Sequence, residues 1–279
     1  MERTLTPEFE IELKLLLEAI NHKYDYDFRN YALTSIKRRI VQAMDHMKCH
    51  TLSALQEKIL HDSNSFYDLL QFLTIPVSEM FRDSSYFLAL REKVIPLLKT
   101  YPSLKVWVAG CSTGEEVYSL AILLQEEELL ERTILYATDI NPRSLEKAKK
   151  GIFDLKEIQK FTQNYQKSGG KRSLSDYYTA SNKVDSNSVK FHSALIKNVT
   201  FSDHCLVTDS VFSEMQLISC RNVLIYFNRE LQERAFGLFH ESLCRHGFLG
   251  LGSKETIQFS KYTKLFDPFV IKDRIFQKK

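Results

Sequence analysis

The feature that most constrains the fold of this chain is an alternation of short apolar runs with helix-period segments. The runs LKVWVAG at 104–110 and TILYATD at 133–139 are typical of buried parallel strands. The segment 115–131 between them keeps its apolar residues on one helix face, and SLEKAKK at 144–150 indicates another helix. Strand, helix, strand, helix at this spacing predicts a parallel α/β layer with right-handed crossovers.

The alternation returns in the last third of the chain. It predicts three further strands and one helix, at 199–206, 215–222, 247–252 and 228–245. The last segment, 266–278, predicts a closing pair of strands. By contrast, the first hundred residues have apolar side chains at helix spacing, and residues 1–72 contain no strand alternation.

A polar stretch from residue 151 to about 198 interrupts the α/β pattern. It predicts a loop followed by a small β-hairpin, with strands at 176–180 and 189–192 and the turn SNKVDSN between them. Residues 141–200 carry twelve bases against five acids. That excess of positive charge makes the stretch a candidate docking surface for an acidic partner.

Composition excludes several classes of protein. Apolar residues make up 44% and charged residues 26%, as in an ordinary globular protein. There is no run of about eighteen apolar residues and no apolar segment near the start, so we expect neither membrane insertion nor a signal peptide, and a cytoplasmic location. The net charge of +3 is too small to favour nucleic-acid binding. The five cysteines show no metal-ligand spacing, which predicts free thiols and no metal.

A glycine-rich turn follows the first predicted strand, between Gly110 and Gly114. Small residues there let a ligand approach the backbone at the carboxyl end of a strand. The GxGxxG spacing of dinucleotide sites and the GxxxxGK[ST] spacing of nucleotide-phosphate loops are both absent. Because Glu115 and Glu116 would repel a phosphate, the turn favours a ligand with an ammonium or sulfonium charge.

The second predicted strand ends at Asp139. A carboxylate in this position can accept hydrogen bonds from both hydroxyls of a ribose, or it can cap the helix that opens at Pro142. The residues alone leave these alternatives open. Taken with the acidic turn, the ribose alternative indicates an adenosyl ligand with a cationic tail, a description that S-adenosylmethionine fits.

Five segments then give a more specific indication when they are read in order. They are FRNYALTSIKRRI, IPVSEMFRD, VAGCSTGEEVYSLA, ATDI and SCRNVLIYFN, at 28–40, 75–83, 108–121, 137–140 and 219–228. In sequence and spacing, over nearly the whole chain, they resemble the chemoreceptor glutamate methyltransferases of the CheR family.

The resemblance implies an organisation and an activity. We expect an N-terminal all-α domain at 1–75, a linker and connecting helix at 76–103, and an α/β, class I (Rossmann-like) S-adenosylmethionine-dependent methyltransferase domain at 104–279. A small antiparallel β-subdomain is expected as an insert at about 165–198. The implied reaction transfers the cofactor's methyl group to glutamate carboxylates of chemoreceptors, giving methyl esters and S-adenosylhomocysteine. The implied partners are the receptors' cytoplasmic methylation helices, and we expect a monomer.

The resemblance also assigns site residues. Cofactor contacts carry over to Ser78, Arg82, Gly110, Glu115 or Glu116, Asp139, Cys205, Leu206, Arg221 and Asn222. Arg82 and Tyr226 carry over as catalytic residues, and Arg38 and Arg39 as substrate-binding residues. The chain departs from the family at Pro76 and at Cys205, where many members have asparagine. These departures affect the expected contacts to the methionine tail and to the adenine.

Plainer roles remain open for four of these residues. Arg82 can form a surface ion pair with Asp83. Arg38 and Arg39 can belong to a solvated helix face, although one of two adjacent residues must point away from the core. Tyr226 can be a core aromatic residue.

The implied reaction needs no strong general base, because a free glutamate has a pKa near ~4.3 and is ionised at neutral pH. Catalysis would depend on alignment, with Arg82 and Tyr226 orienting the carboxylate. A methyltransferase acting on nucleic acid or an amide would typically carry [DNS]PP[YFW] where this chain has SCRN at 219–222. A second alternative is a non-catalytic S-adenosylmethionine-binding signalling module, which the departures at Pro76 and Cys205 would allow.

Overall fold

The computed structural model describes residues 6–74, 78–180 and 187–279. Contacts between Cα atoms divide the chain into two compact units, which we treat separately. The helical unit is Met1–Ile75 with Ile225–Gln232, and the sheet unit is Pro76–Leu224 with Glu233–Lys279. A short segment from late in the chain, which carries Tyr226, therefore groups with the N-terminal helices.

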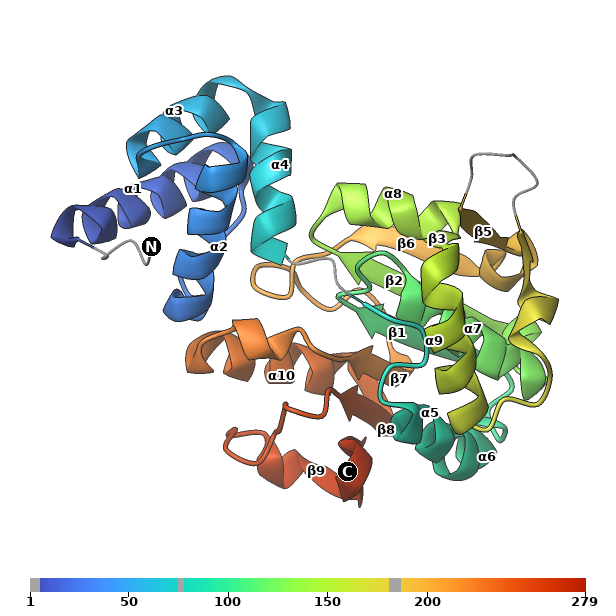
Figure 1. Ribbon diagram of the computed structural model, residues 1–279. Coiled ribbons are helices and arrows are strands. Elements are labelled where there is room, and N and C mark those ends of the chain that lie inside the picture. Colours follow the sequence, from blue (N-terminus) through green and yellow to red (C-terminus); the bar gives the residue numbers. More distant parts are fainter. Residues whose placement is uncertain (1–5, 75–77, 181–186) are drawn as a thin grey trace. The chain divides into compact units, whose positions relative to one another are not determined.

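The N-terminal part of the helical unit, over the described residues 6–74, contains four helices (Figure 1). They are α1 (Pro7–Tyr24), α2 (Leu33–His46), α3 (Leu52–His61) and α4 (Ser63–Thr74). Helix α1 begins after Thr6, whose side chain accepts a hydrogen bond from the backbone N–H of Phe9. Most apolar residues at helix spacing are buried, among them Leu13, Leu16, Leu17, Ile20, Ile36, Ile40 and Met44, whereas Phe9 is half-buried. The prediction of an all-α N-terminal region is confirmed.

The sheet unit is built on a seven-stranded sheet in the order β6-β2-β1-β7-β8-β10-β9. The strands are β1 (Leu104–Ala109), β2 (Thr133–Asp139), β6 (Val199–Asp203), β7 (Met215–Cys220), β8 (Leu243–Leu251), β9 (Phe266–Val270) and β10 (Ile275–Lys278). The pairings among β6, β2, β1, β7 and β8 are parallel, and β10 is antiparallel to both neighbours. The predicted α/β architecture is confirmed.

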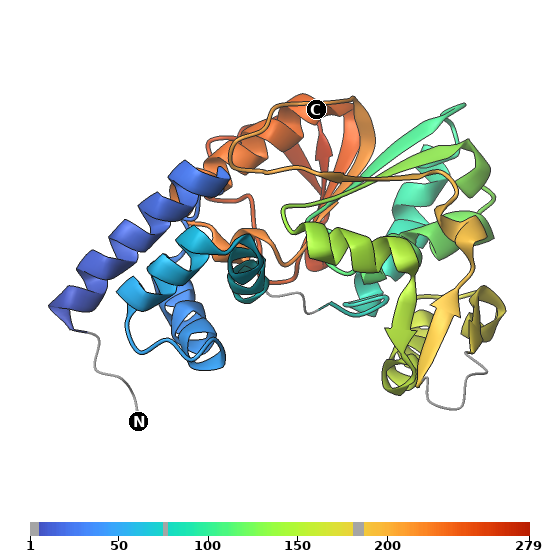
Figure 2. The same cartoon turned by 90° about the horizontal axis from the view of Figure 1, so that it is seen from above.

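Helices lie on both sides of this sheet (Figure 2). They are α5 (Ser84–Ala89), α6 (Ile95–Leu98), α7 (Glu115–Glu126), α8 (Pro142–Lys150), α9 (Leu155–Lys167) and α10 (Arg229–Ser242). A short π-helical turn at Leu90–Val94 joins α5 to α6. Strand β8 begins at Leu243, earlier than predicted, and Leu243 and Cys244 are buried as sheet residues.

The polar insert is partly helical, so the loop predicted at its start is wrong. Helix α9 begins after Asp154, which caps it, and buries Ile158, Phe161 and Tyr165. These residues recur every three or four positions, but the polar residues around them concealed the pattern. The predicted hairpin strands are present, and a third strand joins them. The small sheet has the order β3-β5-β4, with β3 (Ile152–Asp154), β4 (Tyr178–Ala180) and β5 (Ser188–Phe191). Most of the predicted turn lies outside the described residues.

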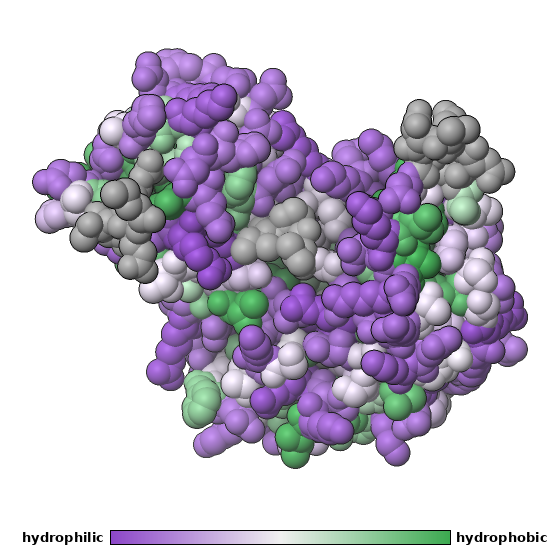
Figure 3. All heavy atoms as spheres, viewed as in Figure 1, coloured by the Kyte–Doolittle hydropathy of each residue, from purple (hydrophilic) through white to green (hydrophobic). Residues whose placement is uncertain are grey.

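Hydrophilic side chains cover most of the face seen in Figure 3 in both units. Within the described ranges, no helix combines the length and the apolar character needed to cross a membrane.

Candidate active site

Three of the predicted site residues lie where the parallel strands end. Asp139 ends β2, Cys205 lies two residues after β6, and Arg221 follows β7 directly. Since β1, β2, β6 and β7 are parallel neighbours, their carboxyl ends share one edge of the sheet. This is the edge at which open α/β sheets bind their ligands.

The glycine-rich turn after β1 is shaped by packing. Gly110 and Gly114 have φ angles of 76° and 98°, where residues with side chains are strained. A Cβ atom on Gly110 would lie 2.4 Å from Val223, and one on Gly114 would lie 2.8 Å from Ala148. Glycine is therefore required at both positions by conformation and by space. The hydroxyl of Ser112, between them, is buried without a hydrogen-bond partner among the described residues.

Asp139 supports this turn. Its carboxylate accepts hydrogen bonds from the backbone N–H groups of Ser112, at 2.8 Å, and Asn141, at 2.9 Å. The cap of α8 is Asn141, whose side chain accepts from the backbone of Arg143 and Ser144. Asp139 is therefore not the helix cap that the sequence allowed. Burial raises the pKa of Asp139, opposed by the backbone hydrogen bonds that it accepts.

Glu115 and Glu116 have different surroundings. Glu115 is buried and accepts hydrogen bonds from the hydroxyl of Thr113, at 2.7 and 2.8 Å, and from Ser78. Burial raises the pKa of Glu115, against these hydrogen bonds. Glu116 is committed to Arg221, whose Nη1 lies 3.0 Å from Oε2, and to Ser219, whose hydroxyl donates at 2.6 Å. The carboxylate that lies beside Ser78 is therefore Glu115.

Arg221 is a buried ion-pair residue, with 1% of its side chain exposed. Its Nη2 donates to the carbonyl oxygen of Arg82 at 2.7 Å and to the carboxylate of Asp83 at 2.8 Å. Its guanidinium carbon also lies 4.2 Å from the centre of the Tyr86 ring. Burial acts to lower the pKa of Arg221, but the nearby charge of Glu116 and other groups outweighs burial and raises it. Both Nη atoms are thus held by the protein itself.

Asn222 adopts a left-handed conformation, with φ of 61°. Its backbone N–H donates to Glu255 at 3.0 Å, and the same carboxylate accepts from Val223 and Leu224, at 2.9 and 2.7 Å. The backbone N–H of Gly252 is a fourth donor to it, at 2.6 Å. Glu255 therefore fixes the loop after β7. Sequence reasoning missed this residue, because a lone glutamate distant from the motifs gave no signal.

Arg82 lies on the turn that precedes α5. Its side chain is partly buried, and its guanidinium has no hydrogen-bond or ion-pair partner among the residues that the structure describes. The surface ion pair with Asp83 that the sequence allowed is not formed there, since Asp83 pairs with Arg221.

The loop after β6 contains the family departure at Cys205. The backbone N–H of Cys205 donates to Asp209 at 2.8 Å, and its carbonyl oxygen accepts from the backbone of Asp209 at 2.9 Å. Leu206 is buried and Cys205 is half-buried. The other departure, Pro76, lies outside the described residues.

The helical unit holds the remaining predicted residues. On α2, Arg38 is exposed and Arg39 is buried, so these neighbours have different environments. The guanidinium carbon of Arg39 lies 4.1 Å from the centre of the Tyr226 ring, and Nη1 donates to the carbonyl oxygen of Leu73. Burial lowers the pKa of Arg39. Tyr226 is half-buried, and its carbonyl oxygen accepts from the backbone of Ala32 at 2.8 Å.

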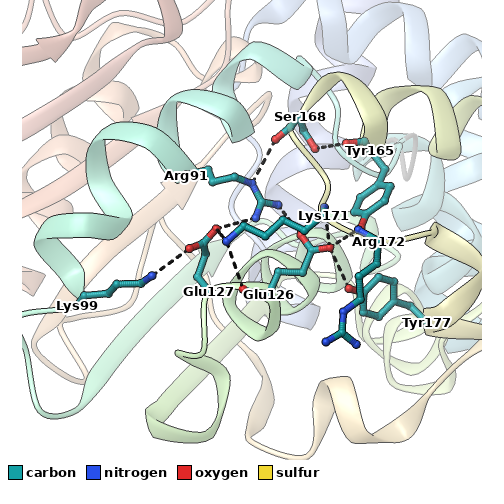
Figure 4. Close-up of polar contacts among 9 residues, drawn as sticks. All are labelled: Arg91, Lys99, Glu126, Glu127, Tyr165, Ser168, Lys171, Arg172 and Tyr177. Atoms are coloured by element: carbon teal, nitrogen blue, oxygen red, sulfur yellow. Dashed lines mark hydrogen bonds and ion pairs between the residues drawn. The ribbon is translucent and has the colours of Figure 1, made fainter.

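Part of the basic stretch is internally paired (Figure 4). Lys171 forms an ion pair of 2.7 Å with Glu127, which also pairs with Arg91 and Lys99 at 2.8 and 3.0 Å. Burial acts to raise the pKa of Glu127, but hydrogen bonds from Lys171, Lys99 and Arg91 outweigh burial and lower it to about 2. Lys171, in the basic stretch 141–200, therefore belongs to this ion-pair cluster.

The same cluster includes Glu126. Its carboxylate accepts hydrogen bonds from the hydroxyls of Tyr165 and Tyr177 and from the backbone of Lys171 (Figure 4). Arg91 adds an ion pair of 2.7 Å. Together these contacts tie the end of α7 to α9 and to the segment that leads into β4.

All five cysteines are free thiols, as predicted. In residues 6–74, 78–180 and 187–279, no three His, Cys, Asp or Glu side chains are grouped so that they could hold a metal ion.

Comparisons with known proteins match both units. Residues 76–270 match the family described as CheR methyltransferase, SAM binding domain, and residues 11–74 match the CheR methyltransferase all-alpha domain. Cher3 of Pseudomonas putida is 61% identical over 269 residues, which are 96% of this chain and 97% of that protein. The chemotaxis protein methyltransferase of Listeria monocytogenes is 30% identical over 258 residues, 91% of this chain and 93% of that protein. That of Salmonella typhimurium is 30% identical over 209 residues, 74% and 68% of the two chains.

Proposed function

The chain belongs to the CheR methyltransferase family, and from this premise we propose that it methylates glutamate side chains of chemoreceptors. It is an S-adenosylmethionine-dependent methyltransferase of chemotaxis. The proposal concerns the acceptor, a glutamate carboxylate in a receptor's cytoplasmic methylation helix, and the product, a glutamate methyl ester. S-Adenosylhomocysteine is the other product.

One observation carries the proposal. The carboxylates of Glu115 and Asp139 lie buried or half-buried at one edge of the sheet, and Arg82 of the same unit has a guanidinium without a partner among the described residues. Glu115 directly follows the glycine-rich turn, and Asp139 accepts a hydrogen bond from Ser112 within it. Burial raises the pKa of both carboxyls. The buried and unpartnered hydroxyl of Ser112 is a further group that a bound polar ligand would satisfy. These residues fit an adenosyl sulfonium cofactor.

We assign the cofactor contacts accordingly. Asp139 would bind the ribose hydroxyls, Glu115 and Ser78 the charged tail, and Cys205 and Leu206 the adenine. Gly110 lets the cofactor approach the backbone. When bound, S-adenosylmethionine supplies a methyl group on a positively charged sulfur.

Catalysis by the chain's own residues would be a matter of orientation. The acceptor carboxylate is already ionised at neutral pH, so no group needs to remove a proton from it. Arg82 would orient that carboxylate. The hydroxyl of Tyr226 would donate a hydrogen bond to it as its negative charge is lost during methyl transfer. The exposed Arg38 would contact the acidic receptor helix, whereas the burial of Arg39 favours a role in holding Tyr226.

We propose a cytoplasmic monomer that binds neither nucleic acid nor a metal. We also propose that the residues at about 165–198 form a β-subdomain, to whose strands β4 and β5 the earlier strand β3 adds. The helical unit and the linker at 76–103 would be separate parts of the same enzyme.

The test is methyl transfer from labelled S-adenosylmethionine to membranes that contain candidate chemoreceptors. Label should enter the receptor with the wild-type protein and be strongly reduced with Arg82→Ala. Binding of S-adenosylhomocysteine should be measured on the same preparations. Tight cofactor binding without transfer to any receptor would instead support the non-catalytic signalling module.

A further inference from the structure

The turn that carries Arg82 has an uncommon backbone. Phe81 and Asp83, on either side of Arg82, have positive φ angles of 51° and 53°. This left-handed region is disfavoured for residues with side chains, because Cβ approaches the carbonyl oxygen of the peptide that follows. Two such residues in one short turn persist only where other contacts hold them.

Two elements of the sheet unit hold the turn. Ser119 of α7 accepts a hydrogen bond of 2.9 Å from the backbone N–H of Phe81. Arg221, after β7, donates from one nitrogen, Nη2, to the carbonyl oxygen of Arg82 at 2.7 Å and to the carboxylate of Asp83 at 2.8 Å. A single guanidinium therefore fixes two consecutive residues of the turn.

Other side chains of the sheet unit hold the guanidinium of Arg221 in place. Its Nη1 pairs with Glu116 at 3.0 Å, and the other oxygen of Glu116 accepts from Ser219 at 2.6 Å. The guanidinium also stacks on the ring of Tyr86. Charge-assisted hydrogen bonds in a buried, planar arrangement such as this one define a single geometry. The charge of Arg221 is thus neutralised by acids of the protein and not reserved for a ligand.

Arg82 shows the opposite pattern. Its backbone is clamped, while its guanidinium has no hydrogen-bond or ion-pair partner in the described part of the chain. The protein fixes the backbone position of Arg82 and leaves its guanidinium available to an incoming anion. A rigid backbone under a free charged group is a form of preorganisation.

We propose that Arg221 is a positioning residue, which together with Asp83 locks the turn that presents Arg82 to the acceptor carboxylate. This inference rests on the proposed function, because it requires Arg82 to act on the acceptor. It gives Arg221 a role that differs from the cofactor contact implied by family resemblance. The strain at Phe81 and Asp83 is the feature that makes such a lock necessary.

Asp83→Asn is the most selective test. It removes the charge with little change in volume, at a side chain that is 36% exposed. We expect kcat to fall about tenfold while the Kd for S-adenosylhomocysteine changes less than about twofold. Arg221→Lys keeps the charge but lacks the planar fork, so we expect a larger fall in kcat. Asp267→Asn is the matched control, because it breaks an exposed ion pair with Lys279 in the same unit.

A double variant separates positioning from general damage. If Arg221 and Asp83 act through Arg82, then Asp83→Asn should cost almost nothing further in an Arg82→Ala background. Hydrogen exchange gives a readout that does not depend on turnover. The peptide covering residues 78–90 should exchange faster in Asp83→Asn than in the wild type, with unchanged exchange in Asp267→Asn.

Three results would overturn the proposal. The first is that Asp83→Asn has the kcat and the hydrogen exchange of the wild type. The second is that Asp83→Asn lowers kcat by the same factor in the wild-type and the Arg82→Ala backgrounds. The third is that Arg221→Lys loses enough cofactor affinity to account for its lost activity. Failure of the proposed function looks different, because the wild type would then methylate no chemoreceptor. The exchange measurement would still decide whether Asp83 locks the turn.

Discussion

Arg39 of α2 lies over the ring of Tyr226, with 4.1 Å between the guanidinium carbon and the ring centre. Tyr226 comes from the segment Ile225–Gln232, which groups with the N-terminal helices although it follows the sheet strand β7 in sequence. The buried cation therefore fixes the orientation of the tyrosine that we propose as catalytic. An arginine stacked on an aromatic face restricts the orientation of the ring.

This relationship makes Tyr226→Phe an informative variant. The phenylalanine ring can still stack under Arg39, so we expect the free energy of unfolding to change by less than about 1 kcal/mol. Methyl transfer should fall by at least about tenfold, because the hydrogen bond to the reacting carboxylate is lost. Urea unfolding and labelled transfer measure the two quantities, with Tyr262→Phe as control. Unchanged transfer would remove Tyr226 from the catalytic residues.

Asp139→Ala should weaken cofactor binding. The substitution removes the carboxylate that we propose accepts hydrogen bonds from the ribose hydroxyls, and each hydrogen bond to a charged group contributes about 1.5–3 kcal/mol. Because Asp139 also accepts from Ser112 and Asn141, the variant should loosen the glycine-rich turn as well. Titration calorimetry with S-adenosylhomocysteine is the measurement, and Asp139→Asn tests whether the charge is needed. Wild-type affinity in both variants would reject the ribose assignment.

Glu115 should make cofactor affinity depend on pH. Burial raises its pKa above the ordinary value of 4.5, so the side chain becomes neutral on acidification earlier than a free glutamate does. The neutral form no longer attracts a sulfonium. We expect the affinity for S-adenosylmethionine to fall on acidification relative to that for S-adenosylhomocysteine, whose sulfur is uncharged, and to do so at a pH above the ordinary pKa of a glutamate.

The same titration in Glu115→Gln should give a ratio of affinities that does not change with pH. A constant ratio in the wild type would show that Glu115 does not sense the sulfonium.

Glu127 should make stability depend on pH in the acid range. Its pKa is 4.5 in an unfolded chain and about 2 in the folded protein. A lowered carboxylate pKa stabilises the fold above the unfolded value, and that contribution is lost as pH falls from 4.5 towards about 2. The shift corresponds to roughly 3 kcal/mol at most. Glu127→Gln should therefore be less stable than the wild type near neutral pH, with a smaller further loss in acid.

Urea unfolding at several pH values measures this difference. Parallel pH profiles for the two proteins would contradict the role of Glu127 in the cluster with Lys171.

The seven-stranded sheet could be predicted because buried parallel strands such as 104–110 and 133–139 are continuous apolar runs, which sequence periodicity detects directly. Helix α9 could not, because only three of its apolar residues face the core. Tertiary contacts between side chains could not be predicted either. The sequence gives no means to tell that Asp83 pairs with Arg221 and not with Arg82, or that Glu255 holds the loop at Asn222.

Receptor docking should depend on ionic strength. Arg38 on α2 and Lys147 and Lys150 on α8 are exposed, and such charges are screened within roughly 8 Å at physiological salt. The association rate with a receptor's cytoplasmic fragment should fall as salt rises, while cofactor affinity changes much less. Arg38→Glu should slow association if α2 is the contact, and Lys147→Glu if α8 is.

Stopped-flow mixing at several salt concentrations measures this rate. Lys171→Glu is not a suitable docking variant, because it would also break the ion pair between Lys171 and the buried Glu127. A flat salt dependence in the wild type would reject electrostatic steering.

The central claim is that the acceptor is a glutamate side chain, and mapping the transferred methyl group tests it most directly. Chemoreceptor fragments incubated with the protein and isotopically labelled S-adenosylmethionine should be digested and sequenced by mass spectrometry. The account predicts labelled methyl on specific glutamate residues, as an ester that base removes, and none when those glutamates are replaced by alanine. Label on a lysine, an amide or nucleic acid, or base-stable label on the receptor, would contradict it.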